Sequence, residues 1–327
     1  MIRLDLCHLK SQYNQLPMPA PGTKVTIILA FIAIYIIWGS TYLLNKMAVA
    51  ELPPLFISSI RFFTASLIIF SIARAMKLNL KISKEQLKNS AFLGFLFLVY
   101  GNGIFVWALK YVDSGFAALM AATQPLIVLI LLRVLEHKKI QPRSMIGIVL
   151  GIIGMYLLVS QQGLSTNENM TLGLLMMSSC VLVWSYASIY VGKANLPDNY
   201  FVSSGYQMLI AGVMLSLCSV IIGETWVAPS EWSTTVQWSM LLLIIFGSIV
   251  AFTAFNYLLK VVSPEKVTTS AFVNPIVALF LGWYILDEQL TTQSMVASGI
   301  LLTGVYFITS RKRDGKKVRL SVLRKRV

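Results

Sequence analysis

The sequence predicts an all-α membrane protein in which ten transmembrane helices form two inverted five-helix repeats. Hydrophobic residues make up 57% of the 327 residues and charged residues only 12%, whereas an average soluble domain has roughly 25% charged residues. Ten apolar stretches have about the 20 residues that a helix needs to cross a bilayer. Similar residues also recur in the two halves of the chain at a nearly constant spacing.

The ten stretches are separated by short segments rich in loop-forming residues. We expect the helices at 26–46, 55–76, 89–109, 114–135, 143–160, 171–192, 200–222, 238–261, 267–286 and 292–310. The predicted organisation is a cytoplasmic lead at 1–25, a first repeat at 26–160, a second repeat at 171–310 and a basic cytoplasmic tail at 311–327.

Charge alternates between successive loops. If the N-terminus is cytoplasmic, the cytoplasmic loops contain Arg74, Lys77, Lys81, Lys84, Lys88, Lys138, Lys139, Arg143, Lys193 and Lys266. The opposite loops contain Glu51, Asp113, Glu168, Glu224, Glu231, Asp287 and Glu288. This alternation satisfies the positive-inside rule, so we expect both termini in the cytoplasm of a protein of the bacterial inner membrane. The tail, with nine Lys or Arg residues and one Asp, is expected to contact anionic membrane lipids rather than nucleic acid.

The two halves share residues at matching positions. Trp38 and Trp184 lie 146 residues apart, and Pro125 and Pro275 lie 150 residues apart. Because each repeat has an odd number of helices, the second copy enters the membrane from the opposite side. Such inverted repeats are typical of secondary transporters. The alternative is that membrane helices of similar composition match by coincidence.

The first apolar stretch contains the segment IIWGSTYLLN, which is unusually polar for a helix that faces lipid. Trp38, Thr41 and Tyr42 share one face of the expected helix with Asn45. The corresponding segment of the second half, WSYASIY, contains Trp184 and Ser188. Aromatic and hydroxyl groups on an inward face suit a cavity for a partly polar solute. The alternative for Trp and Tyr is an aromatic belt at the membrane surface.

Two prolines are expected near the middle of the fourth and ninth helices. Pro125 and Pro275 would each free one backbone carbonyl, at Ala121 and Ala271, and each follows an amide residue. In a membrane a freed carbonyl needs a protein or water partner. We therefore expect hinges at both prolines beside a wet cavity, with the amides, Gln124 and Asn274, near the ligand; ordinary kinks are the alternative.

Further polar and aromatic residues are candidates for binding the substrate. Asn102 lies between two glycines in the third helix, and Trp107 corresponds to Tyr257 at a spacing of 150. Arg61 lies inside the second helix, where it anchors an anionic group or extends to the membrane surface. No carboxylate is expected near the middle of the membrane.

The sequence lacks the residues that several classes of function require. Three scattered cysteines and two histidines predict no metal site, and no cofactor or catalytic group is expected. No GxxxxGK segment offers an ATP site. The segment GIVLGIIG at 147–154 predicts close contact between helices, either within the chain or in a homodimer.

These motifs together resemble a known family. WGSTY in the first helix, RF at 61–62, GNG at 101–103 and the segment 246–282 are similar to the EamA branch of the drug/metabolite transporter superfamily. The resemblance implies ten helices, two EamA repeats and export of small metabolites or drugs. The candidate binding residues are aromatic and amide residues with one possible cation, which suits amino acids or amphipathic organic molecules. One departure is the spacing from proline to glutamate, which is 11 residues from Pro125 to Glu136 and 13 from Pro275 to Glu288. The alternatives are an importer or a lipid-headgroup flippase, and then a membrane enzyme or a receptor.

Overall fold

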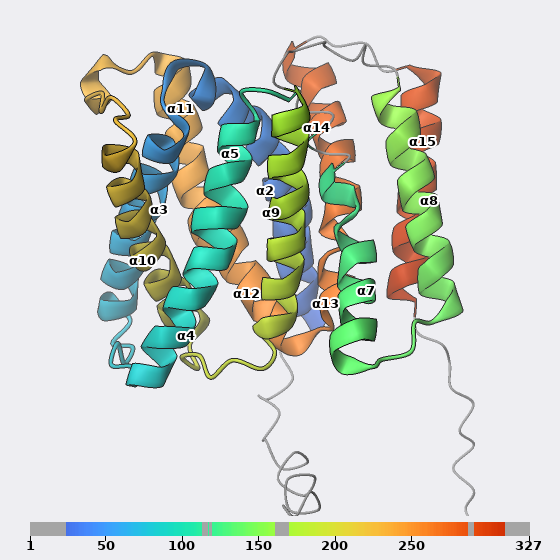
Figure 1. The fold of residues 1–327 in the computed structure, drawn as a ribbon, viewed down its shortest axis with the longest axis horizontal. Coiled ribbons are helices and arrows are strands. Elements are labelled where there is room, and N and C mark those ends of the chain that lie inside the picture. The colour runs from blue at the N-terminus through green and yellow to red at the C-terminus, as the bar shows by residue number, and fades with distance from the viewer. Residues whose placement is uncertain (1–23, 113–116, 118–119, 161–169, 287–290, 311–327) are drawn as a thin grey trace, which may run out of the picture.

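In a computed structural model, residues 24–112, 117, 120–160, 170–286 and 291–310 are described, and every element within them is helical (Figure 1). The elements of the first half are α2 (Lys24–Glu51), α3 (Pro54–Ala75), α4 (Lys84–Gly94), the π-helix η1 (Phe95–Ile104), α5 (Phe105–Ala108), α7 (Gln124–Glu136) and α8 (Pro142–Val159). Those of the second half are α9 (Met170–Tyr190), α10 (Tyr200–Ile221), the 3₁₀-helix η2 (Pro229–Glu231), α11 (Thr234–Leu242), the π-helix η3 (Leu243–Val250), α12 (Ala251–Val261), α13 (Pro264–Val267), α14 (Ser270–Leu286) and α15 (Thr292–Thr309).

Six helical segments within the described residues are long and apolar enough to cross a membrane. They are Lys24–Glu51, Pro54–Ala75, Lys84–Ala108, Thr171–Tyr190, Tyr200–Ile221 and Thr234–Val261. Shorter apolar helices lie at Pro142–Gly154 and Met295–Ile308. The all-helical membrane fold is thus observed, whereas the count of ten crossings stays a prediction, since α7 and α14 have 13 and 17 residues.

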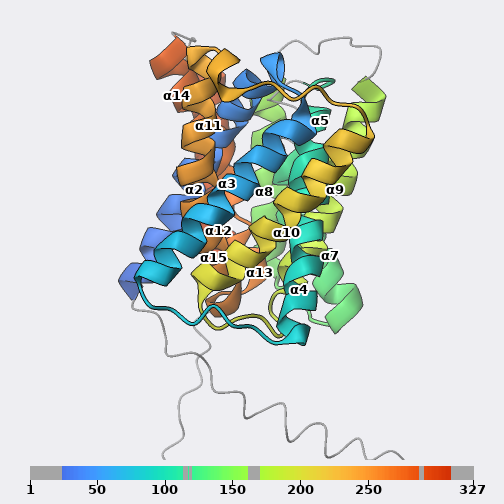
Figure 2. The ribbon, with the colours of Figure 1, turned by 90° about the vertical axis from the view of Figure 1, so that its left-hand side faces the viewer.

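Helices of the two halves pack in a symmetric pattern. α3 packs along α10 at one edge of the bundle, and α8 packs along α15 at the other edge (Figure 1). α2 contacts α14 and α12, and its counterpart α9 contacts α7 and η1. In each half, the first long helix thus contacts the third and fourth expected helices of the other half. Seen from the side in Figure 2, α3 and α10 cross the bundle next to each other.

Gly147 explains the GIVLGIIG segment. A Cβ atom on Gly147 would lie 2.6 Å from the carbonyl oxygen of Gly304, so the two backbones touch within one chain. Gly151 leaves room for the ring of Phe272, because a Cβ there would lie 2.2 Å from the ring carbon Cζ. The close packing that this segment predicts is therefore made between helices of the same chain.

The fourth expected helix is broken rather than kinked. Pro125 lies in the first turn of α7, and a turn at Thr123 precedes it. The prediction that Pro125 is in mid-helix is therefore wrong: a proline in a first turn removes no helical hydrogen bond, so the chain starts a new helix there. Pro275, in contrast, lies inside α14 as expected.

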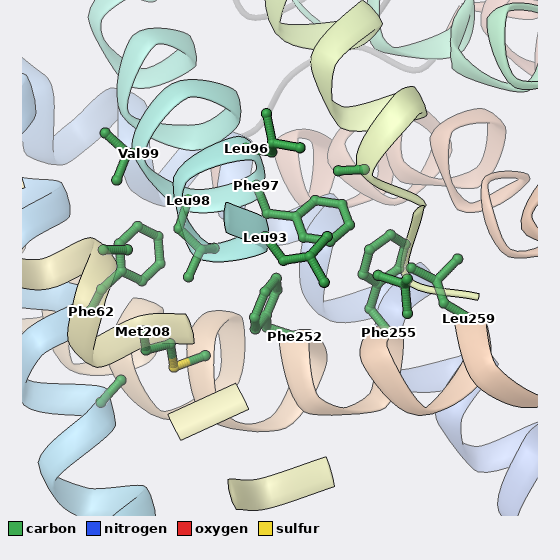
Figure 3. Close-up of a cluster of buried hydrophobic side chains, with 14 of the residues drawn as sticks. Phe62, Leu93, Leu96, Phe97, Leu98, Val99, Met208, Phe252, Phe255 and Leu259 are labelled. Carbon is green, nitrogen blue, oxygen red and sulfur yellow. The ribbon is translucent and has the colours of Figure 1, made fainter. Parts of the chain in front are cut away.

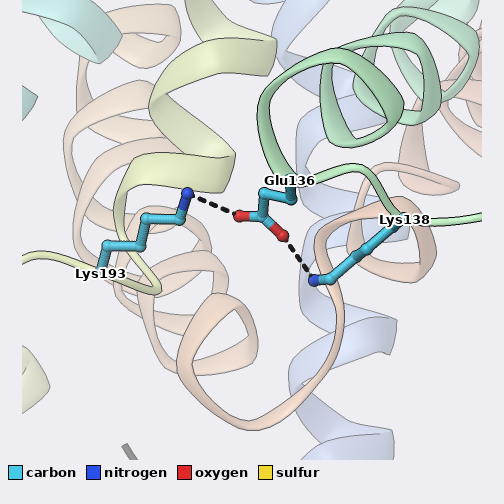
Figure 4. Close-up of polar contacts among 3 residues, drawn as sticks. All are labelled: Glu136, Lys138 and Lys193. Atoms are coloured by element: carbon cyan, nitrogen blue, oxygen red, sulfur yellow. Dashed lines mark ion pairs between the residues drawn. The ribbon is translucent and has the colours of Figure 1, made fainter. Parts of the chain in front are cut away.

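Lys24, where α2 begins, and Thr309, where α15 ends, lie at the same end of the bundle (Figure 1). We call it the basic end because Lys138 and Lys193 lie there. The carboxylate of Glu136 forms ion pairs with Lys138 at 2.6 Å and with Lys193 at 2.8 Å (Figure 4). Burial alone would raise the pKa of Glu136, but the two ammonium groups outweigh it and hold the pKa below its ordinary value. The pair of Glu136 with Lys193 joins the first half to the second.

At the opposite end, a carboxylate caps a helix. The backbone N–H groups of Leu55 and Phe56, in the first turn of α3, donate to Glu224 at 3.1 and 2.8 Å. The hydroxyl of Ser219 donates to the same carboxylate at 2.7 Å. Negative charge is favourable at a helix N-terminus, so Glu224 stabilises the contact between α3 and the segment after α10.

Candidate functional site

One cavity of about 110 Å³ lies among helices of both halves. It is lined by Trp38, Thr41, Tyr42, Asn45, Arg61, Gly101, Asn102, Phe105, Ala121, Gln124, Cys180, Val181, Trp184, Ser270, Ala271 and Asn274. Eight of the residues that the sequence nominates for binding are among them, namely Trp38, Thr41, Tyr42, Arg61, Asn102, Gln124, Trp184 and Asn274. Residues that are distant in sequence thus meet at one place.

The polar segment of the first helix serves two purposes. Trp38, Thr41, Tyr42 and Asn45 line the cavity. Gly39 instead faces α14: a Cβ there would lie 2.6 Å from Cβ of Val277 and 2.9 Å from the carbonyl oxygen of Asn274. Glycine thus allows α14 to approach α2 closely enough to place Asn274 in the cavity wall.

The two π-helices lie beside the cavity. The indole N–H of Trp38 donates to the carbonyl of Gly247 in η3 at 3.4 Å. In η1, a Cβ on Gly101 would lie 2.8 Å from ring carbon Cε3 of Trp184, so this glycine lets the indole pack against the helix backbone. π-helical turns occur often at functional sites, because the wider turn frees backbone groups.

Arg61 is the one cation in the cavity wall formed by the described residues. It is 3% exposed, so it does not extend to the membrane surface. Its Nε donates to the hydroxyl of Ser248 at 2.7 Å, and its carbon Cζ lies 5.0 Å from the ring centre of Phe62. Its Nη1 has no hydrogen-bond partner among the described residues.

Amide groups of the wall also have unused hydrogen-bonding capacity. Asn45 donates through Nδ2 to the carbonyl of Thr41 at 2.8 Å, and its buried Oδ1 has no partner in the described structure. The same is true of Oδ1 of Asn102 and Nε2 of Gln124. Asn274 differs from these three amides, because its side-chain nitrogen donates to the backbone carbonyl of Ser270 at 2.9 Å and to that of Tyr35 at 3.2 Å. Buried groups without partners are costly, which makes them candidates to bind a solute.

Four aromatic rings cluster on the side of the cavity that is nearer the basic end. The ring centres of Trp38 and Trp184 are 5.9 Å apart, Phe255 lies 4.8 Å from Trp38, and Phe97 lies 5.0 Å from Trp184. Phe97 and Phe255 are fully buried and continue into an apolar cluster (Figure 3). Along α2 and α9, Trp38 and Trp184 lie nearer the basic end than the other lining residues of those helices. We call these four rings the aromatic barrier.

Three nominated residues lie away from the cavity. The indole N–H of Trp107 donates to the hydroxyl of Tyr111 at 3.3 Å. Ser188 is fully buried, and its hydroxyl donates to the carbonyl of Trp184 in its own helix at 2.8 Å. Tyr257 packs against Tyr200, with ring centres 5.0 Å apart.

Several lining residues were missed in the sequence. Phe105, Cys180 and Val181 are ordinary residues for an apolar helix, so nothing in the sequence marks them. Ser248, the hydrogen-bond partner of Arg61, could have been noticed in the sequence. It is a hydroxyl residue that follows a glycine within an apolar helix, and the same Gly-Ser pair occurs at Ser40 in the first helix. Ala121 and Ala271, the residues whose carbonyls the prolines were expected to free, both line the cavity.

Comparison with known proteins identifies the family. The sequence model of the EamA-like transporter family matches residues 25–160 and 171–310. The chain belongs to the EamA-like transporter family. In Escherichia coli K12 the protein "Uncharacterized inner membrane transporter YedA" is 35% identical over 286 residues, which cover 86% of this chain and 90% of that protein. This EamA-like chain is therefore a membrane transporter rather than an enzyme.

More distant relatives agree with this placement. "Uncharacterized transporter YoaV" of Bacillus subtilis 168 is 24% identical over 87% of this chain and 97% of its own length. A crystal structure with 17% sequence identity superposes with a TM-score of 0.72 over 88% of this EamA-like transporter and 97% of the other chain. At that identity the likeness supports the fold alone.

Proposed function

We propose that this chain is a secondary transporter that exports small metabolites or drugs across the bacterial inner membrane, with its substrate bound in the central cavity. The observation that carries this proposal is the convergence of polar and aromatic side chains from both halves on one cavity. Amide, hydroxyl and indole groups in an otherwise apolar wall suit a small, partly polar organic solute.

The cavity favours metabolites over larger drugs. Its volume is about 110 Å³, whereas sites for drug-sized ligands usually have roughly 300–1,000 Å³. In this conformation the site thus suits a solute of the size of an amino acid. Larger amphipathic molecules would require the aromatic barrier or the facing helices to move apart.

The proposed mechanism is alternating access by two inverted repeats. The symmetric helix pairs support it, and so do the two π-helices, which begin at Phe95 and Leu243 in corresponding helices of the two halves. If the halves exchange conformations, a cavity closed towards one side of the membrane opens towards it. In this scheme the aromatic barrier closes the path to the cytoplasm, and Pro125 and Pro275 are the flexible points.

The energy source is proposed to be solute exchange or downhill exit. None of the described residues that line the cavity is Asp or Glu, so the cavity lacks the usual carboxylate of a proton-coupled site. Proton antiport is the alternative, and an imposed pH gradient distinguishes the two. Only antiport predicts that the gradient drives accumulation.

Comparative metabolite profiling tests the proposal. Cells that overexpress the protein should release one or a few small solutes into the medium faster than cells that express Asn102→Ala at the same level. The matched control is Ile130→Ala, because Ile130 is 46% exposed on α7 and does not line the cavity. Depletion of a solute from the medium would contradict export and favour an importer of the same fold.

A further inference from the structure

We propose that a second pocket, at the basic end of the bundle, binds the headgroup of an anionic phospholipid. The pocket has a volume of about 460 Å³, within the range of roughly 300–1,000 Å³ that is usual for ligand sites. The described residues that line it are all different from those that line the central cavity, so the two sites are separate. The inference therefore does not depend on which solute the protein transports.

The pocket forms where two consecutive helices pack in different parts of the bundle. α7 packs along α9 and contacts α13, whereas α8 packs along α15. His137, in a left-handed conformation with φ of 53°, ends α7, and a short loop then leads to α8 at the basic end (Figure 1). Residues of α7, this loop, α8, α13 and α15 line the pocket. Both halves of the chain therefore contribute to it.

Positive charge is in excess in the wall of this pocket. Its charged residues, among those that the structure describes, are Lys138, Lys139, Lys266 and Glu265. Lys138 is already paired with Glu136 (Figure 4), whereas Lys139 and Lys266 form no ion pair with any described residue. With Lys138 set aside, two ammonium groups and one carboxylate leave a net charge of +1 (2 − 1). The pocket thus suits an anion from outside the chain.

The charge count favours a phosphodiester over a free phosphate. The phosphodiester of a phospholipid carries one negative charge, which matches the pocket, whereas a phosphomonoester carries about −1.5 to −2 at neutral pH. Lysine binds phosphate as a point charge. If the basic end is cytoplasmic, as the positive-inside rule predicts, the pocket also lies where basic pockets between transmembrane helices bind phospholipid headgroups.

The apolar part of the wall favours a lipid over a water-soluble anion. Besides the lysines, the pocket is lined by Leu129, Leu132, Ile140 and Ile308. Burying apolar surface is favourable, so the glycerol backbone and first methylene groups of a phospholipid would gain from contact with these side chains. An inorganic anion has no apolar surface to bury.

The outer surfaces of α7 and α8 can accommodate the acyl chains of the same lipid. Val134 on α7 and Met145 and Val149 on α8 are exposed apolar residues. Met145 directly follows Ser144, which lines the pocket. Exposed apolar surface marks the parts of a protein that contact a membrane. A headgroup in the pocket therefore leaves its chains beside surfaces that lipid covers.

The polar residues of the wall favour a headgroup that has hydroxyl groups and no cation. Gln141, Ser144 and Ser310 line the pocket together with the lysines. Their amide and hydroxyl groups can both donate to and accept from a hydroxyl group. A headgroup such as that of phosphatidylcholine would instead bring a positive charge towards the lysines. The expected ligand is thus an anionic lipid such as phosphatidylglycerol.

Lipid binding to the purified full-length chain in a neutral detergent tests this inference. The probes are phosphatidylglycerol, phosphatidylcholine with the same acyl chains, and inorganic phosphate. Native mass spectrometry gives the affinity of the first bound lipid, and the midpoint of thermal unfolding is measured in parallel. Phosphatidylglycerol should bind at least tenfold more tightly than phosphatidylcholine and raise the midpoint, because a ligand that binds only the folded state stabilises it. Inorganic phosphate at the same concentration should leave the midpoint unchanged.

Paired variants locate the site. Lys139→Gln with Lys266→Gln should weaken binding of phosphatidylglycerol about 25-fold, because each lysine near a membrane surface strengthens binding of anionic lipid roughly fivefold. The matched control is Lys81→Gln with Lys84→Gln, which removes two exposed charges that do not line the pocket, beside the start of α4 at the same end of the bundle (Figure 2). It should change the affinity less than twofold. Lys139→Arg with Lys266→Arg keeps both charges and should bind the lipid as the wild type does.

Each alternative outcome would overturn the inference. Equal binding of the two lipids would mean that the pocket does not recognise the charge of the headgroup. Equal losses in the two glutamine pairs would assign the binding to the overall charge of the basic end, to which the basic tail contributes equally in every variant. A midpoint raised as much by inorganic phosphate as by phosphatidylglycerol would make the pocket a site for a free anion. Loss of binding in a folded arginine pair would contradict recognition by charge.

Discussion

Replacing Gly39 with alanine should force α2 and α14 apart. The new Cβ would lie 2.6 Å from Cβ of Val277, whereas ordinary contact begins at 3.4 Å, so the helices must separate by at least 0.8 Å (3.4 − 2.6). The second obstacle is the carbonyl oxygen of Asn274 at 2.9 Å. No rotation of a side chain can relieve either contact, because one atom is a Cβ and the other belongs to the backbone. Overpacking of this kind costs roughly 1–3 kcal/mol.

The matched control is Gly299→Ala, in α15. A Cβ on Gly299 meets nothing within 4 Å, so this change alters helix propensity without a clash. Both substitutions stabilise their helix by up to about 1 kcal/mol, because alanine has a higher helix propensity than glycine. The difference in unfolding free energy between the two variants therefore measures the cost of the clash alone. Equilibrium unfolding in mixed micelles should place Gly39→Ala roughly 1–3 kcal/mol below Gly299→Ala. Equal stability of the two variants would refute the close contact between α2 and α14.

The remaining predictions address topology, the cavity and the ends of the bundle. Single cysteines at Glu231 and Glu168 should react with an impermeant thiol reagent added outside the cell, whereas cysteines at Lys81 and Lys316 should not; external labelling at Lys316 would invalidate the predicted orientation. At equal expression, Trp38→Ala and Trp184→Ala should reduce transport severalfold, while Leu242→Ala, at a position outside the cavity wall, should not; normal transport by both tryptophan variants would mean that the cavity is misassigned. Glu224→Gln should lower the free energy of unfolding by about 1–2 kcal/mol relative to Glu231→Gln, as expected for a weakened helix cap, and equal values would count against the cap. The pKa of Glu136 is lower in the folded protein than in the unfolded chain, where it is about 4.3. Its ion pairs therefore stabilise the protein fully at a pH above this unfolded-state pKa, and the stabilisation is lost as the pH falls through the folded-state pKa. The stability difference between wild type and Glu136→Gln should therefore be present at pH 7 and shrink at acidic pH, and a difference that does not change with pH would argue against these ion pairs.

The helices were largely predictable because apolar length is a strong signal in a membrane protein. α3, α8 and α10 begin and end within one residue of their predicted limits. The π-helices were not predictable, since the hydrogen-bond pattern of a wide turn leaves no periodic trace in an apolar segment. The break before Pro125 was missed for a related reason: a proline predicts an interruption, but only tertiary packing decides between a kink and a new helix.

The cavity was predicted in part. Polar residues such as Asn102 stand out within apolar helices, and most of those nominated do line the cavity. Ser188 shows the limit of this reasoning, because a hydroxyl in a helix can bond to its own backbone instead of facing a ligand. The position of Trp107 could not be inferred either, since an offset of 150 residues relates it to Tyr257 but does not say which way either side chain points.

Solute counterflow in liposomes tests the central claim, that the central cavity is the substrate site of a secondary transporter, most directly. Purified protein would be reconstituted into liposomes loaded with the solute that metabolite profiling identifies, and uptake of the labelled solute would be followed without ATP. The wild type and Ile130→Ala should exchange the solute, and Asn102→Ala and Trp184→Ala should exchange it at most a few-fold above empty liposomes. A strict requirement for ATP, or exchange by both cavity variants at the wild-type rate, would contradict the account.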